Sequence, residues 1–370
     1  MIFQTLDDKT ECVGIYADKQ LLFDPSEWPA DLKYTWNYSP YLRDFEEVEY
    51  VSLYLEGKPI QEIVPEYLQD DWTDVSKKIQ AFKRSLDISQ VNMRENCFFD
   101  LVPRRFLIEY CEIQNKIIHY ILEKIPCPSR YQFYKHVSMM LADISHRPVS
   151  IDQRLLNSLG VNHKYKHLIT NLSKAIPYVH YNQFGTKTGR LTNKSNTLPI
   201  LTLNKSLRGA IKPQNDFYVE LDFNGAEVRT LLGILEKEQP CVDVHQFHLD
   251  EVFPSLVSRE QAKVSFFAWL YGSKKAASSP ESSVLENFYD KKVLLKKYWN
   301  NNTITTPYGK VISDVSQHHA LNYLVQSTAA ELTLKQAVKM DYLLRKYSKC
   351  SRIAFLIHDA VVIDMKKEDE

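Results

Sequence analysis

The sequence predicts an α+β fold, because strand-rich and helix-rich segments follow one another along the chain. Residues 1–65 contain short strand-like segments, including a hairpin over residues 12–23. Residues 66–160 place apolar side chains at helical spacing. Beyond about residue 180, strand-like and helical segments alternate. We therefore expect a mixed region at each end of the chain, with helices between them.

Composition sets broad limits on function. The 370 residues suffice for two or three domains, and the 46 acidic residues balance the 46 basic ones. A neutral chain can still bear a local basic groove, so net charge does not exclude nucleic acid. The six scattered cysteines indicate reduced thiols. The absence of a signal peptide and of a long apolar run predicts a cytoplasmic protein with no membrane partner.

Helix-capping residues, loop-forming residues and apolar periodicity predict the elements in more detail. Asp152 ends one helical region and is a candidate cap for the next helix. The small, polar residues 276–283 predict a mobile loop. The expected C-terminal elements are a strand at 218–221, a helical segment at 225–232, helices at 258–272 and 317–345, and a hairpin at 353–363.

The helix predicted at 258–272 has an unusual stripe of side chains. Arg259, Lys263, Phe267 and Tyr271 are each four residues apart, so they share one helix face. Two cations and two aromatic rings in line suit a nucleoside triphosphate, with phosphates on the cations and rings beside the base and sugar. Taken alone, such cations more often form a solvated face, and such rings a core face.

Two aspartates have contexts that complete a metal-dependent nucleotidyl-transfer site. Asp222 ends an apolar strand, and Asp359 follows His358 in a tight turn between two apolar strands. A pair of carboxylates can hold two divalent ions about 3.5–4 Å apart, which clamp both oxygens of an in-line displacement. Either aspartate by itself is more often a cap or a turn residue. Their combination with the stripe of residues 259–271 favours the metal site.

Together these segments resemble the polymerase module of the family A DNA polymerases. The resemblance covers roughly residues 140–365. The matching segments, in chain order, are Thr188–Leu191, the stretch containing Leu198, Pro199 and Arg208, Asp222–Arg229, Asp243–His245, Arg259–Gly272, Asn322–Glu331 and His358–Asp359.

The resemblance implies a right-hand polymerase with an antiparallel palm sheet and helical fingers. Residues 1–125 would be a small, shrunken α/β domain resembling a 3′→5′ exonuclease, inactive because no Asp-x-Glu pair appears on its first strand. Residues 126–187 would be linker helices and a thumb remnant, and residues 188–370 palm and fingers, with the fingers at about 233–300. The short span before Thr188 indicates a reduced thumb. The trimmed domains are typical of a compact phage-like enzyme, placed in the host cytoplasm and associated with the nucleoid.

The resemblance also assigns catalytic and nucleotide-binding roles. Asp222 and Asp359, helped by the backbone carbonyl of Phe223, would bind two Mg²⁺ ions, for which Mn²⁺ could substitute. Lys263 would protonate the leaving pyrophosphate. The expected dNTP-binding residues are Arg259, Lys263, Phe267, Tyr271, His245 and Glu227, of which Glu227 would exclude a ribose 2′-OH by its size and by holding Tyr271.

Primer-template DNA is the second implied partner. Its expected contacts are Arg190, Arg208, Asn322, Gln326 and His358. A processivity or replisome partner could replace the reduced thumb.

Several positions depart from the family pattern. Gly225 replaces a common glutamine, which removes a minor-groove contact, and Ala268 replaces a glycine of the fingers motif. Ala360 replaces a glutamate and removes one carboxylate from the metal site. His318 occupies a position that is commonly arginine.

The leading hypothesis is a template-directed DNA polymerase that adds dNTPs to a primer 3′-OH. One alternative is a single-subunit RNA polymerase, which Glu227 and Phe267 disfavour because a ribonucleotide enzyme needs room at the 2′-OH. Another is a catalytically weak or dead DNA-binding subunit for replication or repair, which the reduced thumb favours and the two retained aspartates oppose.

Overall fold

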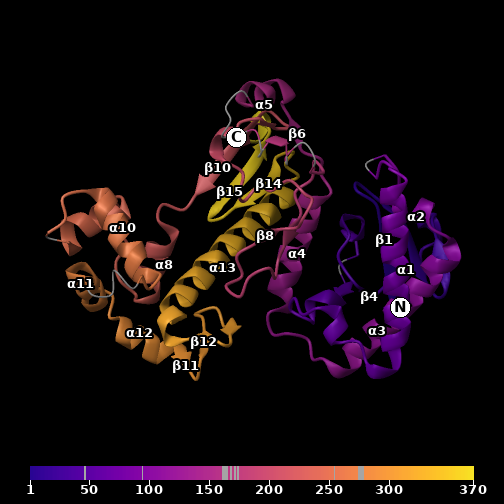
Figure 1. Ribbon diagram of the computed structural model, residues 1–370, viewed down its shortest axis with the longest axis horizontal. Coiled ribbons are helices and arrows are strands. Elements are labelled where there is room, and N and C mark those ends of the chain that lie inside the picture. The colour runs from indigo at the N-terminus through magenta and orange to yellow at the C-terminus, as the bar shows by residue number, and fades with distance from the viewer. Residues whose placement is uncertain are drawn as a thin grey trace. The chain divides into compact units, whose positions relative to one another are not determined.

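The computed structural model describes residues 1–45, 47–93, 95–160, 166, 169, 170, 172, 175–253, 255–273 and 279–370. The chain forms two compact units (Figure 1). The N-terminal unit comprises residues 1–183 and 193–212, and the C-terminal unit comprises residues 184–192 and 213–370. No described helix combines the length and apolar character needed to cross a membrane.

The N-terminal unit begins with an antiparallel sheet in the order β1 (Phe3–Asp7), β2 (Cys12–Ala17) and β3 (Gln20–Leu22). The predicted hairpin of residues 12–23 is confirmed as β2 and β3. Asp18 and Lys19 turn it with φ values of 46° and 65°, the left-handed backbone that a two-residue hairpin turn requires.

Short strands and 3₁₀ turns lead from this sheet into helices. They are η1 (Pro25–Glu27), β4 (Tyr34–Thr35), η2 (Pro40–Leu42), β5 (Glu49–Tyr50), η3 (Val51–Leu53), η4 (Ile60–Glu62) and η5 (Glu66–Leu68). The following elements are α1 (Gln69–Ile88), α2 (Phe98–Leu101), α3 (Arg104–Lys124), α4 (Tyr131–Ser145), β6 (Ser150–Ile151), α5 (Gln153–Leu159), β7 (Tyr181–Asn182), β8 (Thr192–Asn193), α7 (Lys205–Arg208) and β9 (Ile211–Lys212). The sequence prediction of helices over 66–160 is thus confirmed, with breaks between them.

Apolar periodicity explains the core of this unit. Ile113, Ile117 and Ile121 lie on one face of α3 and are buried with Val75 of α1. The predicted cap is also confirmed, because the Asp152 carboxylate accepts hydrogen bonds from two backbone N–H groups at the start of α5.

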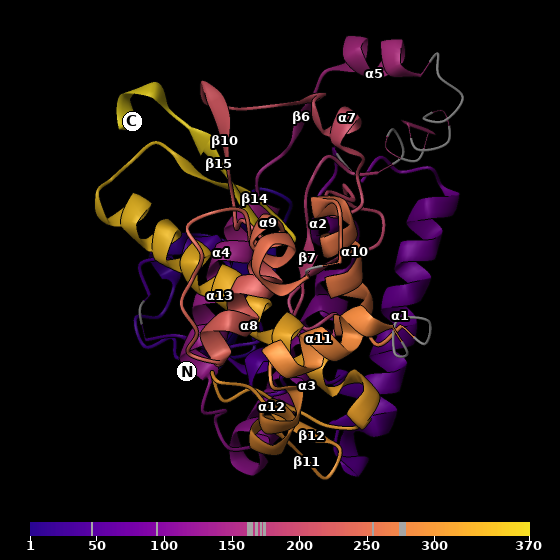
Figure 2. The ribbon, with the colours of Figure 1, turned by 90° about the vertical axis from the view of Figure 1, so that its left-hand side faces the viewer.

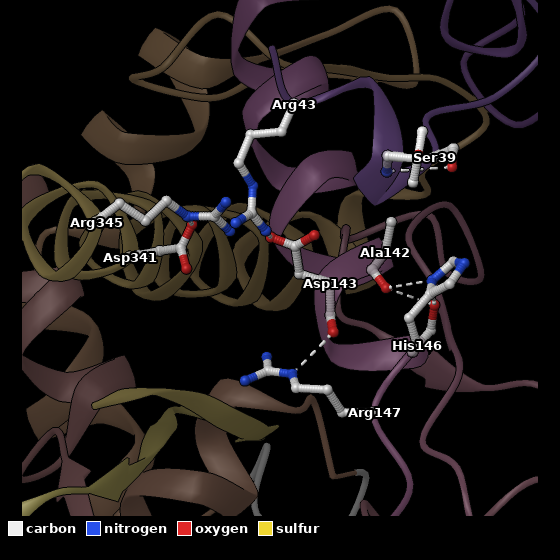
Figure 3. A network of polar contacts seen from close by, with 10 residues as sticks. Ser39, Arg43, Ala142, Asp143, His146, Arg147, Asp341 and Arg345 are labelled. Atoms are coloured by element: carbon white, nitrogen blue, oxygen red, sulfur yellow. Dashed lines mark hydrogen bonds and ion pairs between the residues drawn. The ribbon is translucent and has the colours of Figure 1, made fainter. Parts of the chain in front are cut away.

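A polar network secures the end of α4 (Figure 3). Arg43 donates to the buried Asp143 carboxylate at 3.1 Å, and Arg147 donates to the backbone carbonyl of Asp143 at 2.9 Å. The His146 ring lies 2.9 Å from the Ala142 carbonyl. The Arg147 and His146 contacts add side-chain bonds to carbonyls in the last turn of α4, and Arg43 pairs with the Asp143 carboxylate.

The C-terminal unit contains a second antiparallel sheet, in the order β10 (Phe217–Asp222), β15 (Ala360–Met365) and β14 (Arg352–Ile357). Its other elements are α8 (Ala226–Ile234), α9 (Val244–Phe247), the π-helical turn η6 (His248–Val252), α10 (Arg259–Leu270), α11 (Pro280–Phe288), α12 (Lys291–Tyr298), β11 (Trp299–Asn300), β12 (Thr303–Thr305), β13 (Val311–Ile312), α13 (Gln317–Lys346) and η7 (Lys367–Asp369). The strand, helices and hairpin predicted for this region are confirmed.

Within this unit, α13 runs from the sheet to a group of shorter helices (Figure 1). Phe266 and Trp269 of α10 are buried against Tyr289, which follows α11. The sheet and the helical group are therefore parts of one compact unit, linked by α13.

One predicted segment is wrong in part. Residues 280–283 belong to α11 instead of a loop, because Ser279 caps the helix and Pro280 occupies its first turn. Residues 276–278 of the same predicted loop lie outside the described residues.

Candidate active site

The two predicted metal-binding aspartates meet at one end of the C-terminal sheet. Asp222 is the last residue of β10 and pairs across the ladder with Ala360, the residue after Asp359. Asp222 is exposed, yet partial desolvation, followed by the negative charges of Asp359 and Glu220, raises the pKa of its carboxyl. Strand register therefore brings together two acids that are far apart in the sequence.

The turn between β14 and β15 places its two polar residues differently. His358 is exposed and has a φ of 57°, whereas Asp359 is half-buried. Half-burial follows from the position of Asp359 beside the end of β10, where Asp222 lies on the neighbouring strand.

This pair fits a divalent cation on electrostatic grounds. Like charges in contact are unfavourable unless a cation lies between them, and carboxylates are the ligands that Mg²⁺ prefers. Across the described ranges, no three His, Cys, Asp or Glu side chains gather as a metal site. The chain thus supplies two carboxylates here, and the backbone carbonyl of Phe223 is the adjacent candidate ligand.

The stripe on α10 has the predicted geometry. Ser258 caps the helix by accepting a hydrogen bond from the backbone N–H of Gln261 at 3.3 Å. The Phe267 and Tyr271 rings stack with centroids 5.6 Å apart, and Lys263 is exposed. One face of α10 therefore presents an exposed lysine and a pair of stacked rings.

Arg259 has a partner that sequence reasoning did not assign. Its guanidinium donates to both oxygens of Asp243, at 2.9 and 2.8 Å. Asp243 also caps α9 by accepting from the backbone N–H groups of His245 and Gln246. The Arg259 guanidinium, and then these backbone bonds, hold the pKa of Asp243 well below its usual range. The sequence signalled the cap, since an aspartate just before a helix is a frequent N-cap, but not the pairing with Arg259.

His245 lies beside this ion pair and is almost fully buried. Its ring is 5.7 Å from the ring of Phe267, and its Nδ1 has no hydrogen-bond partner among the described residues. Burial lowers the pKa of His245; the charge of Asp243 opposes this shift, and those of Arg259 and Lys263 add to it. The ring is therefore neutral at physiological pH and can donate or accept one hydrogen bond.

Glu227 joins residues from three segments. This buried carboxylate accepts hydrogen bonds from the Arg190 guanidinium and from the Tyr271 hydroxyl, the latter at 2.9 Å. Burial, together with Glu227, raises the pKa of Tyr271 to about 12. The Gln326 side chain also reaches the Tyr271 hydroxyl. The carboxylate therefore fixes the ring at the end of α10.

The predicted DNA-binding residues are divided between the units. Asn322 and Gln326 are half-buried on α13, with Arg190 and His358 in the same C-terminal unit. Arg208 ends α7 in the N-terminal unit, so the structure does not join it to the others.

Gly225, which departs from the family pattern, and Gly272, which matches it, both have local structural reasons. Gly225 has a φ of 69°, and a Cβ there would lie 2.3 Å from Val244 Cγ2. Gly272 has the same φ, and a Cβ there would lie 2.7 Å from the ring of His318. Both glycines therefore sit where a larger residue would be strained.

Comparison with known proteins supports a specific fold. No model of a known protein family matches the sequence. The chain is 23% identical over 258 residues to DNA polymerase I of Aquifex aeolicus, an alignment that covers 60% of this chain and 45% of that protein. Its structure is similar to the polymerase domain of Pol1 from M. smegmatis, solved with DNA primer-template and dNTP, with a TM-score of 0.56 and 14% identity. That similarity covers 72% of this chain and 70% of the other.

In sequence and in fold, the chain resembles a family A polymerase module. The sequence-based resemblance is thereby confirmed at the level of the module. The chain spans less than half the length of the curated relative. Within this module, the aspartate pair lies at the end of the β10–β15 ladder and Glu227 on the helix that follows β10.

Proposed function

We propose that the C-terminal unit is a template-directed DNA polymerase that adds dNTPs to a primer 3′-OH and releases pyrophosphate. The observation that carries the proposal is the meeting of Asp222 and Asp359 in the unit that also contains the α10 stripe. Phosphoryl transfer needs little covalent work from the protein, so positioning and charge neutralisation are the main requirements.

Asp222, Asp359 and the Phe223 carbonyl would hold two Mg²⁺ ions, with Mn²⁺ as a substitute. Bound there, the ions would polarise the phosphoryl oxygens and lower the pKa of the primer hydroxyl. The mutual repulsion of the two carboxylates supports this assignment, since it would be relieved by bound cations.

Lys263 and Arg259 would bind the triphosphate in different ways. Lys263 is exposed and can approach a phosphate directly, as a proton donor to the leaving pyrophosphate. Arg259 is held by Asp243, so it would have to share or exchange that carboxylate for a phosphate. His245, neutral and with Nδ1 available, would add one hydrogen bond.

Glu227 and Tyr271 would select the sugar. The carboxylate of Glu227 is fixed by Arg190 and by the Tyr271 hydroxyl, so it cannot easily move aside for a ribose 2′-OH. Phe267 would lie against the deoxyribose, and Tyr271 would stack at the nascent base pair.

Arg190, Asn322, Gln326 and His358 would contact the primer-template duplex, and Arg208 would do so from the other unit. These polar side chains can bind phosphates or the minor groove. The right-hand arrangement would assign residues 188–370 to palm and fingers, the fingers at about 233–300, and residues 126–187 to linker helices and a thumb remnant. A processivity or replisome partner would then replace the thumb.

The N-terminal region, residues 1–125, would be an inactive exonuclease-like scaffold. Gln4 on β1 is buried and donates to Asn115 of α3 at 2.8 Å. Neutral amides in such a pair cannot supply the charge that a metal site needs. Proofreading is therefore not part of the proposal.

Primer extension tests the proposal directly. With Mg²⁺ and dNTPs, the wild-type chain should extend a primer, and Asp359→Ala should bind the same DNA without extending it. Efficient use of NTPs would favour the RNA polymerase alternative. Equal, null extension by both proteins, with retained DNA binding, would favour a non-catalytic DNA-binding subunit.

A further inference from the structure

α12 is electrostatically unlike the other helices of this chain. Four of its eight residues, Lys291, Lys292, Lys296 and Lys297, are lysines, and none is acidic. Of the described helices with eight or more residues, no other has basic residues without acidic ones. In a chain whose charges balance overall, this concentrates positive charge at one place.

The first turn of this helix has an unfavourable arrangement of charge. Lys291 and Lys292 lie there, where the helix dipole disfavours cations, whereas Lys296 and Lys297 lie in the last turn, where it favours them. Asp290 precedes the helix in a left-handed conformation, without a side-chain capping hydrogen bond. Lys292 and Lys296 are a like-charge pair at the i, i+4 spacing, which also destabilises a helix. A merely solvated face would be more stable with the mixed charges found on α1 or α3.

Three of the lysines form an exposed face. Leu294 is buried and Lys291 forms an ion pair with Glu286 at 3.1 Å, so both belong to the inner side. Lys292, Lys296 and Lys297 are exposed, and none of them forms an ion pair with a carboxylate of the described residues. We call these three lysines the α12 basic face.

Aromatic and amide groups adjoin this face. Lys297 Nζ lies 5.1 Å from the centre of the Tyr298 ring, and an exposed turn containing Asn301 follows β11. Figures 1 and 2 both show α12 next to β11 and β12. Cations with neighbouring aromatic and amide groups are typical of surfaces that bind single-stranded nucleic acid.

The face is connected to the candidate active site through the core. Lys291 Nζ lies 5.8 Å from the ring centre of Trp269, near the end of α10 and just before Tyr271. Trp269 in turn stacks on Tyr289, which joins α11 to α12. A strand held on α12 would thus be held on the same packed body as the α10 stripe.

We propose that the α12 basic face binds the phosphates of the single-stranded 5′ template overhang. The inference rests on the proposed polymerase function, which supplies such a strand ahead of the nascent base pair. The contacts would be electrostatic and independent of sequence, so they would raise affinity for primed templates with long overhangs and fall steeply with salt.

The experiment measures affinity for primer-template by fluorescence anisotropy, using the full chain. Overhangs of about 3 and about 15 nucleotides bracket the length that one single-strand site covers. The test variant is Lys292→Gln/Lys296→Gln/Lys297→Gln. On the long overhang, the slope of log K against log salt should become shallower by about 2, since each lost single-strand phosphate contact contributes about 0.7. On the short overhang the slope should not change.

Matched variants control for charge and folding. Lys77→Gln/Lys83→Gln/Arg84→Gln on α1 makes the same change in net charge and should leave both slopes unchanged. Replacing the three α12 lysines by arginine should preserve the wild-type slope, and an unchanged melting temperature would show that the test variant is folded.

Three results would overturn the inference. Equal slopes for wild type and test variant on both overhangs would show that the face is solvated and binds no DNA. An equal loss of slope on both overhangs would show that the face binds the duplex. An equal loss of slope in the α1 variant would show that net charge alone explains the effect. Failure of the wild-type chain to bind or extend primed DNA would instead reject the proposed function.

Discussion

Each compact unit contains a three-stranded antiparallel sheet, and the two sheets differ in the carboxyl groups at their ends. In the N-terminal sheet, the Gln4 amide donates a hydrogen bond to the Asn115 side chain. Burial raises the pKa of Asp7, the single carboxyl at the end of β1. In the C-terminal sheet, two carboxylates, Asp222 and Asp359, meet with no ion-pair partner from the described part of the chain. The N-terminal sheet therefore carries a single carboxyl at this end, whereas the C-terminal sheet carries a pair whose charge a cation would neutralise.

The largest effect on primer extension should come from removing either carboxylate of the C-terminal pair. Asp222→Ala or Asp359→Ala should lower primer extension by more than about 10³-fold, because a metal clamp provides several kcal/mol of transition-state stabilisation. DNA affinity should change little. Steady-state extension and anisotropy measure the two effects.

Asp7→Asn provides the matched control in the other sheet. It removes a carboxyl from a sheet end in the same way, and extension should remain at the wild-type level. A comparable loss of extension in this variant would mean that the N-terminal sheet takes part in the reaction.

Lys263→Ala should have the next largest effect on extension. The loss of a general acid lowers a rate by about 10²–10⁴-fold, and dNTP binding should also weaken. Single-turnover extension at several dNTP concentrations separates rate from affinity. Gln261→Ala, another exposed position on α10, should retain the wild-type rate.

Glu227→Ala should relax sugar selection by about tenfold or more, because it opens space at the 2′ position of the nucleotide. Competition between dNTP and NTP in one extension reaction gives the ratio of incorporation. Tyr271→Phe removes one donor to the same carboxylate and should produce a smaller change. Unchanged selectivity in both variants would contradict the assigned role of Glu227.

The smallest expected effect concerns stability in acid. Burial lowers the pKa of His248 from 6.5 to about 3, and its Nε2 is hydrogen-bonded to the hydroxyl of the buried Tyr289. Because the folded state disfavours the protonated ring, its contribution to stability is present above pH 6.5 and is lost as the pH falls toward about 3.

The double variant His248→Phe/Tyr289→Phe tests this dependence without leaving the hydroxyl unpaired. Its melting temperature should fall less than that of the wild type between neutral pH and about pH 4.5. An equal fall in melting temperature in the two proteins would exclude His248 as the titrating group. Because both residues belong to the core beside α10, a readout limited to the C-terminal unit, such as amide exchange, is the sharper measurement.

The sequence predicted elements wherever the signal was local. The cap at Asp152, the stripe on α10 and the hairpin around Asp359 follow from spacing, capping chemistry and alternation. β1 was not delimited, because its FQTLD segment is short and mixes polar with apolar residues on both faces.

Side-chain partners were less predictable than elements. The bond between Arg190 and Glu227 and the pair of Arg259 with Asp243 join segments separated in the chain. Nothing local in the sequence specifies such bonds, because they depend on which helices pack together. The position of Arg208 in the N-terminal unit has the same origin, since Asn193–Lys212 crosses back to that unit.

The left-handed turn at Gly225 has an evolutionary consequence. Any side chain introduced there would collide with Val244 and would also strain the backbone. A longer residue at position 225 therefore requires two changes, a smaller residue at position 244 and a local backbone outside the left-handed region.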